Sequence, residues 1–529
     1  MGTTVSVLRG PSTVARRPAG GYRMCMSSAY APSAPPSPTT LSAVQLARAI
    51  RAGELTSLQA VEAHVERIEA VNPRINAVVG TRYEQARQEA RRADARLAQE
   101  GPEQLPPLHG VPCTIKECFA LTGMPQTAGL VSRRGYLPQR DATAVARLRA
   151  AGAIPLGVTN VSELCMWMET DNEVYGRTRN PYDLGRIVGG SSGGEAAVVA
   201  SGGSPFGLGS DVGGSIRGPA FFNGVFGHKP TGGTVPGTGQ FPIAENEGLR
   251  YLCSGPLCRR AEDLMPLLRL LAGPDGQDAG CEAVTLGDPS DVDLSTLRVV
   301  NVEGIQRMGV DDELLAAQRR AADALSAQGA QVRTVSVDAL EQQFEIWSAM
   351  LSASQDHTFA EMMGLPSTLS ALWELIKWCF GRSEHHLMAS TLALVDVVPR
   401  MLPGLSRKAI EAGQELRGEL VELIGEGGVM LYPSYSTTAP VHGEPARQAW
   451  RRPGRSLPFA YQAIFNVMEL PVTQVPLGLD TAGLPLGVQV VGLHGADHLT
   501  IGVAMALERA MGGWVEPELG RDACKEVLS

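Results

Sequence analysis

Residues 189–195 read Gly189-Gly190-Ser191-Ser192-Gly193-Gly194-Glu195, and residues 207–217 read Gly207-Leu208-Gly209-Ser210-Asp211-Val212-Gly213-Gly214-Ser215-Ile216-Arg217. Glycine lets the backbone approach a ligand closely and adopt positive φ at little cost. Consecutive backbone N–H groups in such turns can point at one anionic spot. Two kinds of site need this arrangement: a phosphate-binding loop, or an oxyanion hole beside a nucleophilic serine.

The spacing of these glycines disfavours phosphate binding. A P-loop requires a lysine directly after its last glycine, and no lysine follows here. The glycines at 207, 209 and 213 miss the dinucleotide-binding spacing by one residue. Serines embedded in glycine suit acyl transfer better, because a hydroxyl and several amides must converge on one carbonyl group.

Residues 189–193 also satisfy the G-x-S-x-G pattern of the nucleophile elbow in α/β-hydrolases. This alternative makes Ser191 the nucleophile of an esterase and requires His494 or His498 as its base. The elbow needs a strong strand immediately before the serine. Residues 183–187, Asp-Leu-Gly-Arg-Ile, form a poor one.

Helical and extended patterns alternate on both sides of the glycine-rich block, which predicts an α/β fold. Strands are predicted at 111–121, 154–158, 297–302, 332–337, 429–432, 471–475 and 488–491. Helices are predicted from Leu41, from Thr56 to Asn72-Pro73, and over 84–99, 143–151, 311–328, 340–410 and 500–511. We find no repeat or linker after Thr40, so residues 41–529 are predicted to form one domain.

Composition and charge narrow the class of protein. The 529 residues carry 46 Lys and Arg against 55 Asp and Glu, a formal net charge of −9, which argues against nucleic acid as a partner. The nine cysteines include no C-x-x-C pair, which disfavours a zinc knuckle, and free thiols in the cytoplasm are expected. No apolar run approaches the length of about 18 residues needed to cross a bilayer.

Residues 1–40 have a different composition from the remainder. They contain four arginines and many Ser, Thr and Pro, but no acidic residue. That composition fits a disordered tail, a misassigned start, or a targeting segment that would direct the protein to an organelle.

Several stretches together resemble the amidase signature family. They are Gly110–Glu117, Thr159–Trp167, Gly189–Thr231, Glu469–Pro471 and Gly483–Gln489, and the resemblance covers about residues 41–515. It implies a large mixed, twisted β-sheet covered by helices, and an enzyme that cleaves linear amides through an acyl-enzyme. Residues 162–167 and 219–224 look most like the fatty-acid amide hydrolase branch, which implies fatty-acid amides as substrates.

The resemblance also assigns the catalytic residues. It makes Ser215 the nucleophile, Ser191 a bridging serine in a cis peptide, and Lys116 the base. It implies an oxyanion hole formed by the backbone amides of Val212, Gly213, Gly214 and Ser215. Neither a metal nor a cofactor is implied. A serine hydroxyl needs a base to take its proton, and lysine can serve only when it is neutral.

The substrate and partners are less constrained. Met166 and Trp167 are expected to border the substrate, a small-molecule amide. The Met- and Trp-rich stretch 347–380 is either an acyl pocket or helix core. A second family activity is kept as an alternative, an amidotransferase subunit that supplies ammonia in tRNA-dependent transamidation. Peripheral contact with a membrane and a homodimer are left open.

Other polar residues near the motifs are expected to have supporting roles. Asp211 and Arg217 are interpreted as a pair that braces the loop, and His228 as structural. Glu117 and Glu195 are interpreted as groups behind the catalytic residues or on the surface. A cysteine nucleophile is disfavoured, and Cys165 would be the only candidate for it near the motifs.

Overall fold

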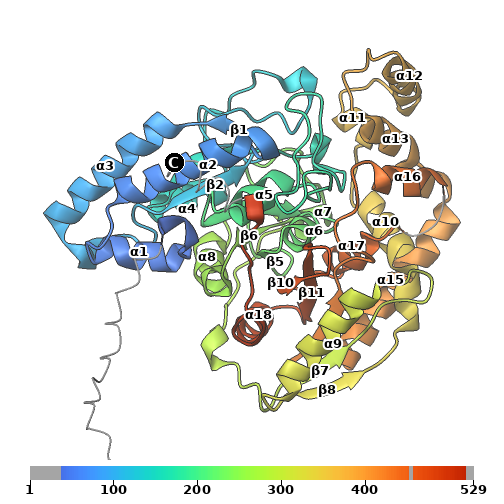
Figure 1. The fold of residues 1–529 in the computed structure, drawn as a ribbon. Coiled ribbons are helices and arrows are strands. Elements are labelled where there is room, and N and C mark those ends of the chain that lie inside the picture. The colour runs from blue at the N-terminus through green and yellow to red at the C-terminus, as the bar shows by residue number, and fades with distance from the viewer. Residues whose placement is uncertain (1–36, 452–456, 520–529) are drawn as a thin grey trace, which may run out of the picture. The chain divides into compact units, whose positions relative to one another are not determined.

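A sheet of eleven strands runs through the described part of the chain (Figure 1). The computed structural model describes residues 37–451 and 457–519. The strands are β1 (Val78–Thr81), β2 (Pro112–Lys116), β3 (Ile154–Thr159), β4 (Phe206–Asp211), β5 (Phe226–Lys229), β6 (Cys253–Cys258), β7 (Arg298–Asn301), β8 (Gln331–Thr334), β9 (Gly428–Pro433), β10 (Val472–Leu479) and β11 (Pro485–Gly492).

The sheet is mixed, and its strand order is β1-β3-β2-β4-β6-β5-β10-β11-β9-β7-β8. β2 pairs in parallel with β3 and β4, and β7 pairs in parallel with β8 and β9. The pairings from β4 through β6, β5, β10 and β11 to β9 are antiparallel. All five residues of β2 are buried between two neighbouring strands, which takes Lys116 out of water.

Helices cover this sheet, which confirms the predicted fold class. α18 packs on β10 and β11, α9 packs on β9 and β11, and α3 packs on β3. The helices are α1 (Ala43–Arg51), α2 (Ser57–Ile75), α3 (Tyr83–Glu100), α4 (Thr143–Ala150), α5 (Gly193–Ala200), α6 (Arg217–Phe222), α7 (Gly248–Tyr251), α8 (Leu264–Leu271), α9 (Asp312–Ser326), α10 (Gln343–Ala353), α11 (Phe359–Met362), α12 (Thr368–Cys379), α13 (Leu387–Val395), α14 (Val398–Met401), α15 (Pro403–Ile424), α16 (Glu444–Arg451), α17 (Ala460–Val467) and α18 (Asp497–Met511).

Helix starts follow local sequence closely, and helix ends follow it less well. Ser42 caps α1, and Thr56 caps α2 in a reciprocal capping box with Gln59. The predicted end of α2 at Asn72-Pro73 is wrong, because the helix continues to Ile75. It stops where Asn76 adopts a left-handed conformation, with φ of 50°.

The sequence analysis did not predict four of the strands, namely β1, β4, β5 and β6. β4 reads Phe-Gly-Leu-Gly-Ser-Asp, and all six of its residues are buried. A strand covered on both faces shows no alternation of apolar and polar residues, and its glycines lower its apparent strand propensity.

The predicted tail falls almost entirely on residues 1–36, which lie outside the described residues. Residues 37–40 are described, and Pro38–Thr40 form a short 3-10 helix that contacts α2. None of the described helices is by itself both long and apolar enough to cross a membrane. The pair α13–α14 and α15, bent by 87°, meets that test of length and composition only when taken together.

Candidate active site

Lys116 is the last residue of β2 and lies at the centre of the site. Its side chain is completely buried. Its Nζ lies 2.7 Å from Ser191 Oγ and 2.9 Å from Ser210 Oγ. The lysine nitrogen is therefore joined to the first predicted catalytic serine by a direct hydrogen bond.

Ser191 is held in the loop before α5. The peptide bond between Gly190 and Ser191 is cis, as the family resemblance implies. The loop presses against Trp167, because a Cβ added to Gly190 would lie only 2.2 Å from the Trp167 carbonyl oxygen. Glycine is thus required at position 190, and the close contact fixes where Ser191 lies.

The residues before Ser191 do not support the esterase alternative. Residues 183–190 form a loop. Its pairing with another segment is one isolated antiparallel β-bridge between Arg186 and Val441. A nucleophile elbow needs a strand at this place to present the serine. Ser192 is a turn residue whose hydroxyl donates to the Ser210 carbonyl at 3.3 Å.

Ser215 lies in the loop between β4 and α6, which a buried ion pair braces. Asp211 and Arg217 are both fully buried, with 2.8 Å between the guanidinium and the carboxylate. The Asp211 carboxylate also accepts the N–H groups of Gly214 and Ile216. Burial alone would raise the pKa of the Asp211 carboxyl, but Arg217 and these donors hold that pKa below its ordinary value. The predicted bracing role of the pair is confirmed.

The backbone amides of this loop differ in what they bind. Gly214 N–H donates to Asp211 Oδ1 at 2.8 Å, so including Gly214 in the oxyanion hole needs correction. Within residues 37–451 and 457–519, the amides of Val212, Gly213 and Ser215 donate no hydrogen bond. Val212, Gly213 and Ser215 are also partly exposed, whereas Gly214 is buried. Three amides are therefore left to receive an oxyanion.

The two serine loops are joined through their backbones. Ser192 N–H donates to the Ser215 carbonyl at 3.2 Å. In the described part of the chain, Ser215 Oγ has no hydrogen-bond partner, so the link from Ser215 to Ser191 is not closed. Catalytic hydrogen bonds are often long without substrate and shorten when substrate binds.

Two residues border the Ser215 loop, namely Trp347, which begins the Met- and Trp-rich stretch, and Gln462, which the sequence did not single out. The Trp347 indole N–H of α10 donates to the Val212 carbonyl at 2.9 Å, and its ring lies against Gly213. Gln462 of α17 lies against Gly214, where an added Cβ would be 2.1 Å from Gln462 Oε1. These contacts connect the Ser215 loop to α10 and α17.

The segment before Trp167 has an unusual backbone conformation. Leu164 and Cys165 both have positive φ, 53° and 59°, which is strained for residues other than glycine. The carboxylate of Glu163 holds the segment in place by accepting from the His385 ring and the His386 N–H. Trp167 is buried and Met166 is partly buried, and their contact with substrate stays a prediction.

Glu117 and Glu195 are both buried, so the surface alternative for them is wrong. Glu117 accepts hydrogen bonds from Thr127 and Ala128, and burial raises its pKa to about 7. Glu195 accepts from Thr114 at 2.7 Å, and burial raises its pKa to about 8. Glu195 connects α5 to β2, and Glu117 connects the residue after β2 to residues 127–128.

The histidines lie outside the catalytic cluster. His228 is buried between Thr473 and Asp497, which confirms its structural role. His494 is exposed, and the His498 ring packs against Gly287. No group of three metal-binding side chains occurs among the residues that the structure describes.

We therefore expect no histidine to take part in catalysis. His494→Ala and His498→Ala should each keep turnover within about threefold of wild type, because general base catalysis is worth far more than that. Steady-state rates on one amide substrate would measure this. A loss of several orders of magnitude in either variant would contradict the lysine-based site.

Comparison with known proteins gives the family. The family model described as Amidase matches residues 59–501. The chain belongs to the amidase family. This amidase is 44% identical over 493 residues to fatty-acid amide hydrolase 2 of Homo sapiens, covering 90% of each chain.

Two further similarities concern other members of the family. The amidase is 33% identical over 481 residues to a glutamyl-tRNA(Gln) amidotransferase subunit of Roseiflexus sp. (strain RS-1), covering 87% of this chain and 94% of that one. The solved structure of 6-aminohexanoate cyclic dimer hydrolase complexed with substrate has a TM-score of 0.74 at 29% identity. It covers 90% of this chain and 99% of that chain. The chain is an amide-hydrolysing enzyme of the amidase signature type.

Proposed function

We propose that this amidase cleaves linear amides through a Ser215–Ser191–Lys116 relay and an acyl-enzyme intermediate. The observation that carries the proposal is the 2.7 Å hydrogen bond between buried Lys116 Nζ and Ser191 Oγ. Beside it, the Ser215 loop presents three unengaged amides.

The proposed reaction begins with neutral Lys116, which takes the Ser191 proton while Ser191 takes the proton of Ser215. The Ser215 oxygen attacks the substrate carbonyl carbon, and the amides of Val212, Gly213 and Ser215 receive the developing oxyanion. The proton then returns through Ser191 to the leaving nitrogen, the C–N bond breaks, and an amine departs. Water repeats the attack on the acyl-enzyme and releases the acid.

For the substrate we propose an amide with an apolar acyl chain. The support is the 44% identity to fatty-acid amide hydrolase 2 and the position of Trp347 against the Ser215 loop. Trp347 stacks edge-on with Phe459, with ring centroids 5.2 Å apart, which extends the apolar wall beyond the loop. The Met- and Trp-rich stretch 347–380 therefore has two parts with different surroundings. Trp347 borders the catalytic site, whereas most of α12 lies on the surface.

Lengthening the acyl chain should therefore raise kcat/KM. Each buried methylene is worth roughly 0.8 kcal/mol, so four extra carbons should give about two orders of magnitude. A series of primary amides of increasing length measures the slope. Trp347→Ala should flatten it, while the control Trp450→Ala, which alters an exposed tryptophan, should not. A flat series beyond four carbons would contradict an apolar acyl pocket.

The amidotransferase alternative is less well supported. The amidotransferase relative is 33% identical to this chain, against 44% for the hydrolase. Assaying the purified chain alone on oleamide, anandamide and glutamine separates the two functions. Hydrolysis of oleamide or anandamide supports the proposal, and release of ammonia from glutamine alone would favour the alternative.

We also propose that the enzyme contacts a membrane through α12 and α14. Large apolar side chains are exposed there, with Leu369 at 77%, Phe380 at 74% and Met401 at 72% exposure. Exposed apolar patches of this kind mark interaction surfaces. A hydrophobic substrate dissolved in lipid would reach the enzyme through such a contact.

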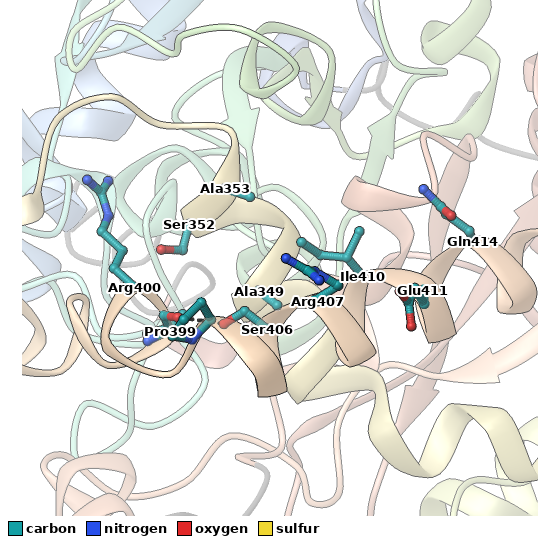
Figure 2. A pocket seen from close by; sticks show the side chains of 11 residues that line it. Ala349, Ser352, Ala353, Pro399, Arg400, Ser406, Arg407, Ile410, Glu411 and Gln414 are labelled. Carbon is teal, nitrogen blue, oxygen red and sulfur yellow. Dashed lines mark hydrogen bonds between the residues drawn. The ribbon is translucent and has the colours of Figure 1, made fainter.

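A hollow of about 480 Å³ lies between α10 and the α14–α15 segment (Figure 2). Arg400, Arg407, Ser352 and Glu411 line it, and neither Lys116, Ser191 nor Ser215 does. The Arg400 guanidinium donates hydrogen bonds to the carbonyl groups of Gln355 and His357. The hollow is therefore separate from the catalytic cluster and is not the proposed acyl pocket.

The triple variant Leu369→Ser, Trp373→Ser and Phe380→Ser should weaken binding to phosphatidylcholine vesicles by about tenfold or more, since each side chain loses apolar burial. Co-sedimentation with vesicles measures it. Leu479→Ser, at the β10–β11 hairpin, serves as the control on another exposed leucine. Unchanged binding in the triple variant would show that α12 is not the contact.

We also propose a cellular compartment and an oligomeric state for the enzyme. Each cysteine described by the structure is a free thiol, which supports a reducing compartment such as the cytoplasm. A homodimer is kept as a proposal that a sedimentation measurement would test.

A further inference from the structure

Ser210, the last residue but one of β4, contacts the side chain of Lys116 through two of its own atoms. Its hydroxyl oxygen lies 2.9 Å from Lys116 Nζ, and its carbonyl oxygen lies 3.4 Å from the same nitrogen. Ser210 is 2% exposed and Lys116 is fully buried, so bulk water does not compete for these contacts. Neither the sequence analysis nor the reaction proposed above assigns Ser210 a role.

The pairing of two strands brings Ser210 to Lys116. β2 and β4 are parallel neighbours, with Ile115 opposite Leu208. The two strands therefore end at the same edge of the sheet, where Lys116 is the last residue of β2. The position of the Ser210 backbone relative to Lys116 is thus set by the sheet, which is more rigid than a loop.

The hydrogen atoms of a neutral lysine decide what these contacts do. A neutral amine has two N–H donors and one lone pair, and the proposed relay needs the lone pair to face Ser191 Oγ. In the part of the chain that the structure describes, three oxygen atoms lie within hydrogen-bond distance of Lys116 Nζ: Ser191 Oγ, Ser210 Oγ and the Ser210 carbonyl oxygen. When both N–H groups donate to Ser210, the lone pair is left for the Ser191 hydroxyl. The 3.4 Å contact is the weaker of the two.

Neighbouring groups hold Ser210 in the orientation that this arrangement needs. Cys118 Sγ lies 3.7 Å from Ser210 Oγ, so the Ser210 hydroxyl can direct its proton at sulfur and its lone pairs at Lys116. The Ser192 hydroxyl donates to the Ser210 carbonyl at 3.3 Å. Ser210 is therefore connected to the lysine and also to the residue that follows Ser191.

We propose that Ser210 is a positioning residue, whose hydroxyl and carbonyl oxygens bind the two N–H groups of neutral Lys116 and turn its lone pair toward Ser191. Ser210 forms no covalent bond and transfers no proton in this role. The inference rests on the proposed relay and adds the group that aims its base. A misplacement of about 1 Å in a catalytic group can cost about 100-fold in rate.

The test uses Ser210→Ala in the purified full chain. Its kcat for amide hydrolysis should fall about 10- to 100-fold while KM stays within about twofold, because the base acts in the chemical step. The rate at which a fluorophosphonate labels Ser215 should fall by a similar factor, since labelling needs the same deprotonation without a leaving amine. A thermal unfolding scan checks that the variant is folded.

Ser254→Ala is the matched control on the neighbouring strand. Ser254 lies opposite Ser210 on β6 and is fully buried, and its hydroxyl donates to Gln240 Oε1 at 3.5 Å. Removing this hydroxyl deletes a buried serine hydroxyl that does not contact Lys116. It should keep kcat within about threefold of wild type, the size expected for one weak hydrogen bond.

A double-mutant cycle separates positioning of the lysine from general support of the fold. In a Lys116→Met background, Ser210→Ala should slow the labelling of Ser215 by less than about twofold, because no amine remains to be aimed. A structural role would slow labelling by the same factor in both backgrounds. Equal factors, or a loss confined to KM, would overturn the inference.

The same variants distinguish this inference from the proposed function. If Lys116→Met slows labelling but folded Ser210→Ala keeps the wild-type kcat, the positioning role is wrong and the relay stands. If Lys116→Met labels as fast as wild type, the relay fails and the role of Ser210 fails with it.

Discussion

Ser215→Ala should abolish amide hydrolysis and leave the fold intact. The variant removes the only hydroxyl that the proposal places beside three unengaged amides, and loss of such a nucleophile costs about four orders of magnitude or more in kcat. Ser215 is partly exposed, and its Oγ makes no hydrogen bond with another described residue, so the structure loses little packing. Single-turnover rates, with a thermal unfolding scan alongside, measure both parts of the expectation.

The matched control is the neighbouring serine. Ser192→Ala removes a 3.3 Å hydrogen bond to the Ser210 carbonyl and should cost only about tenfold, in keeping with one neutral hydrogen bond. If Ser215→Ala kept full activity and Ser191→Ala lost it, Ser191 would be the nucleophile, as the esterase alternative requires.

Lys116→Ala should slow amides far more than esters. An ester's alkoxide departs with little help, whereas an amide nitrogen must gain a proton before it leaves. If Lys116 supplies both the base and the returned proton, its loss harms two steps for an amide and chiefly one for an ester. General acid–base catalysis is worth about 100- to 10,000-fold per group, and we expect the amide loss to exceed the ester loss by a factor in that range.

The measurement is kcat/KM for a matched amide and ester in wild type and variant. Lys116 is fully buried, so Lys116→Met, which keeps most of the side-chain volume, is the control for packing. Equal losses on both substrates in both variants would show that Lys116 only supports the structure.

The sequence by itself determined the fold class and the class of enzyme, through the family resemblance. The resemblance also named Lys116, Ser191 and Ser215 together as the catalytic residues, and their roles stay a prediction. Helix starts such as Ser42 and Thr56 were predictable as well, since a cap bonds residues only three positions away.

Only the tertiary structure decided which atoms around these residues are free. Gly214 looks equivalent to Gly213 in sequence, yet folding commits its N–H to Asp211. Trp347 and Gln462 reach the Ser215 loop from more than a hundred residues away. The sequence does not specify these contacts, because they arise from the packing of α10 and α17 in the folded chain.

The apolar face of α12 is a second feature that the sequence predicts only in part. Leu369, Leu372, Trp373 and Ile376 recur at helical spacing, which predicts an amphipathic helix without naming what covers its face. The structure leaves that face on the surface. Periodicity reports the geometry of one helix, whereas burial depends on which other segments pack against it, and that is settled only when the chain folds.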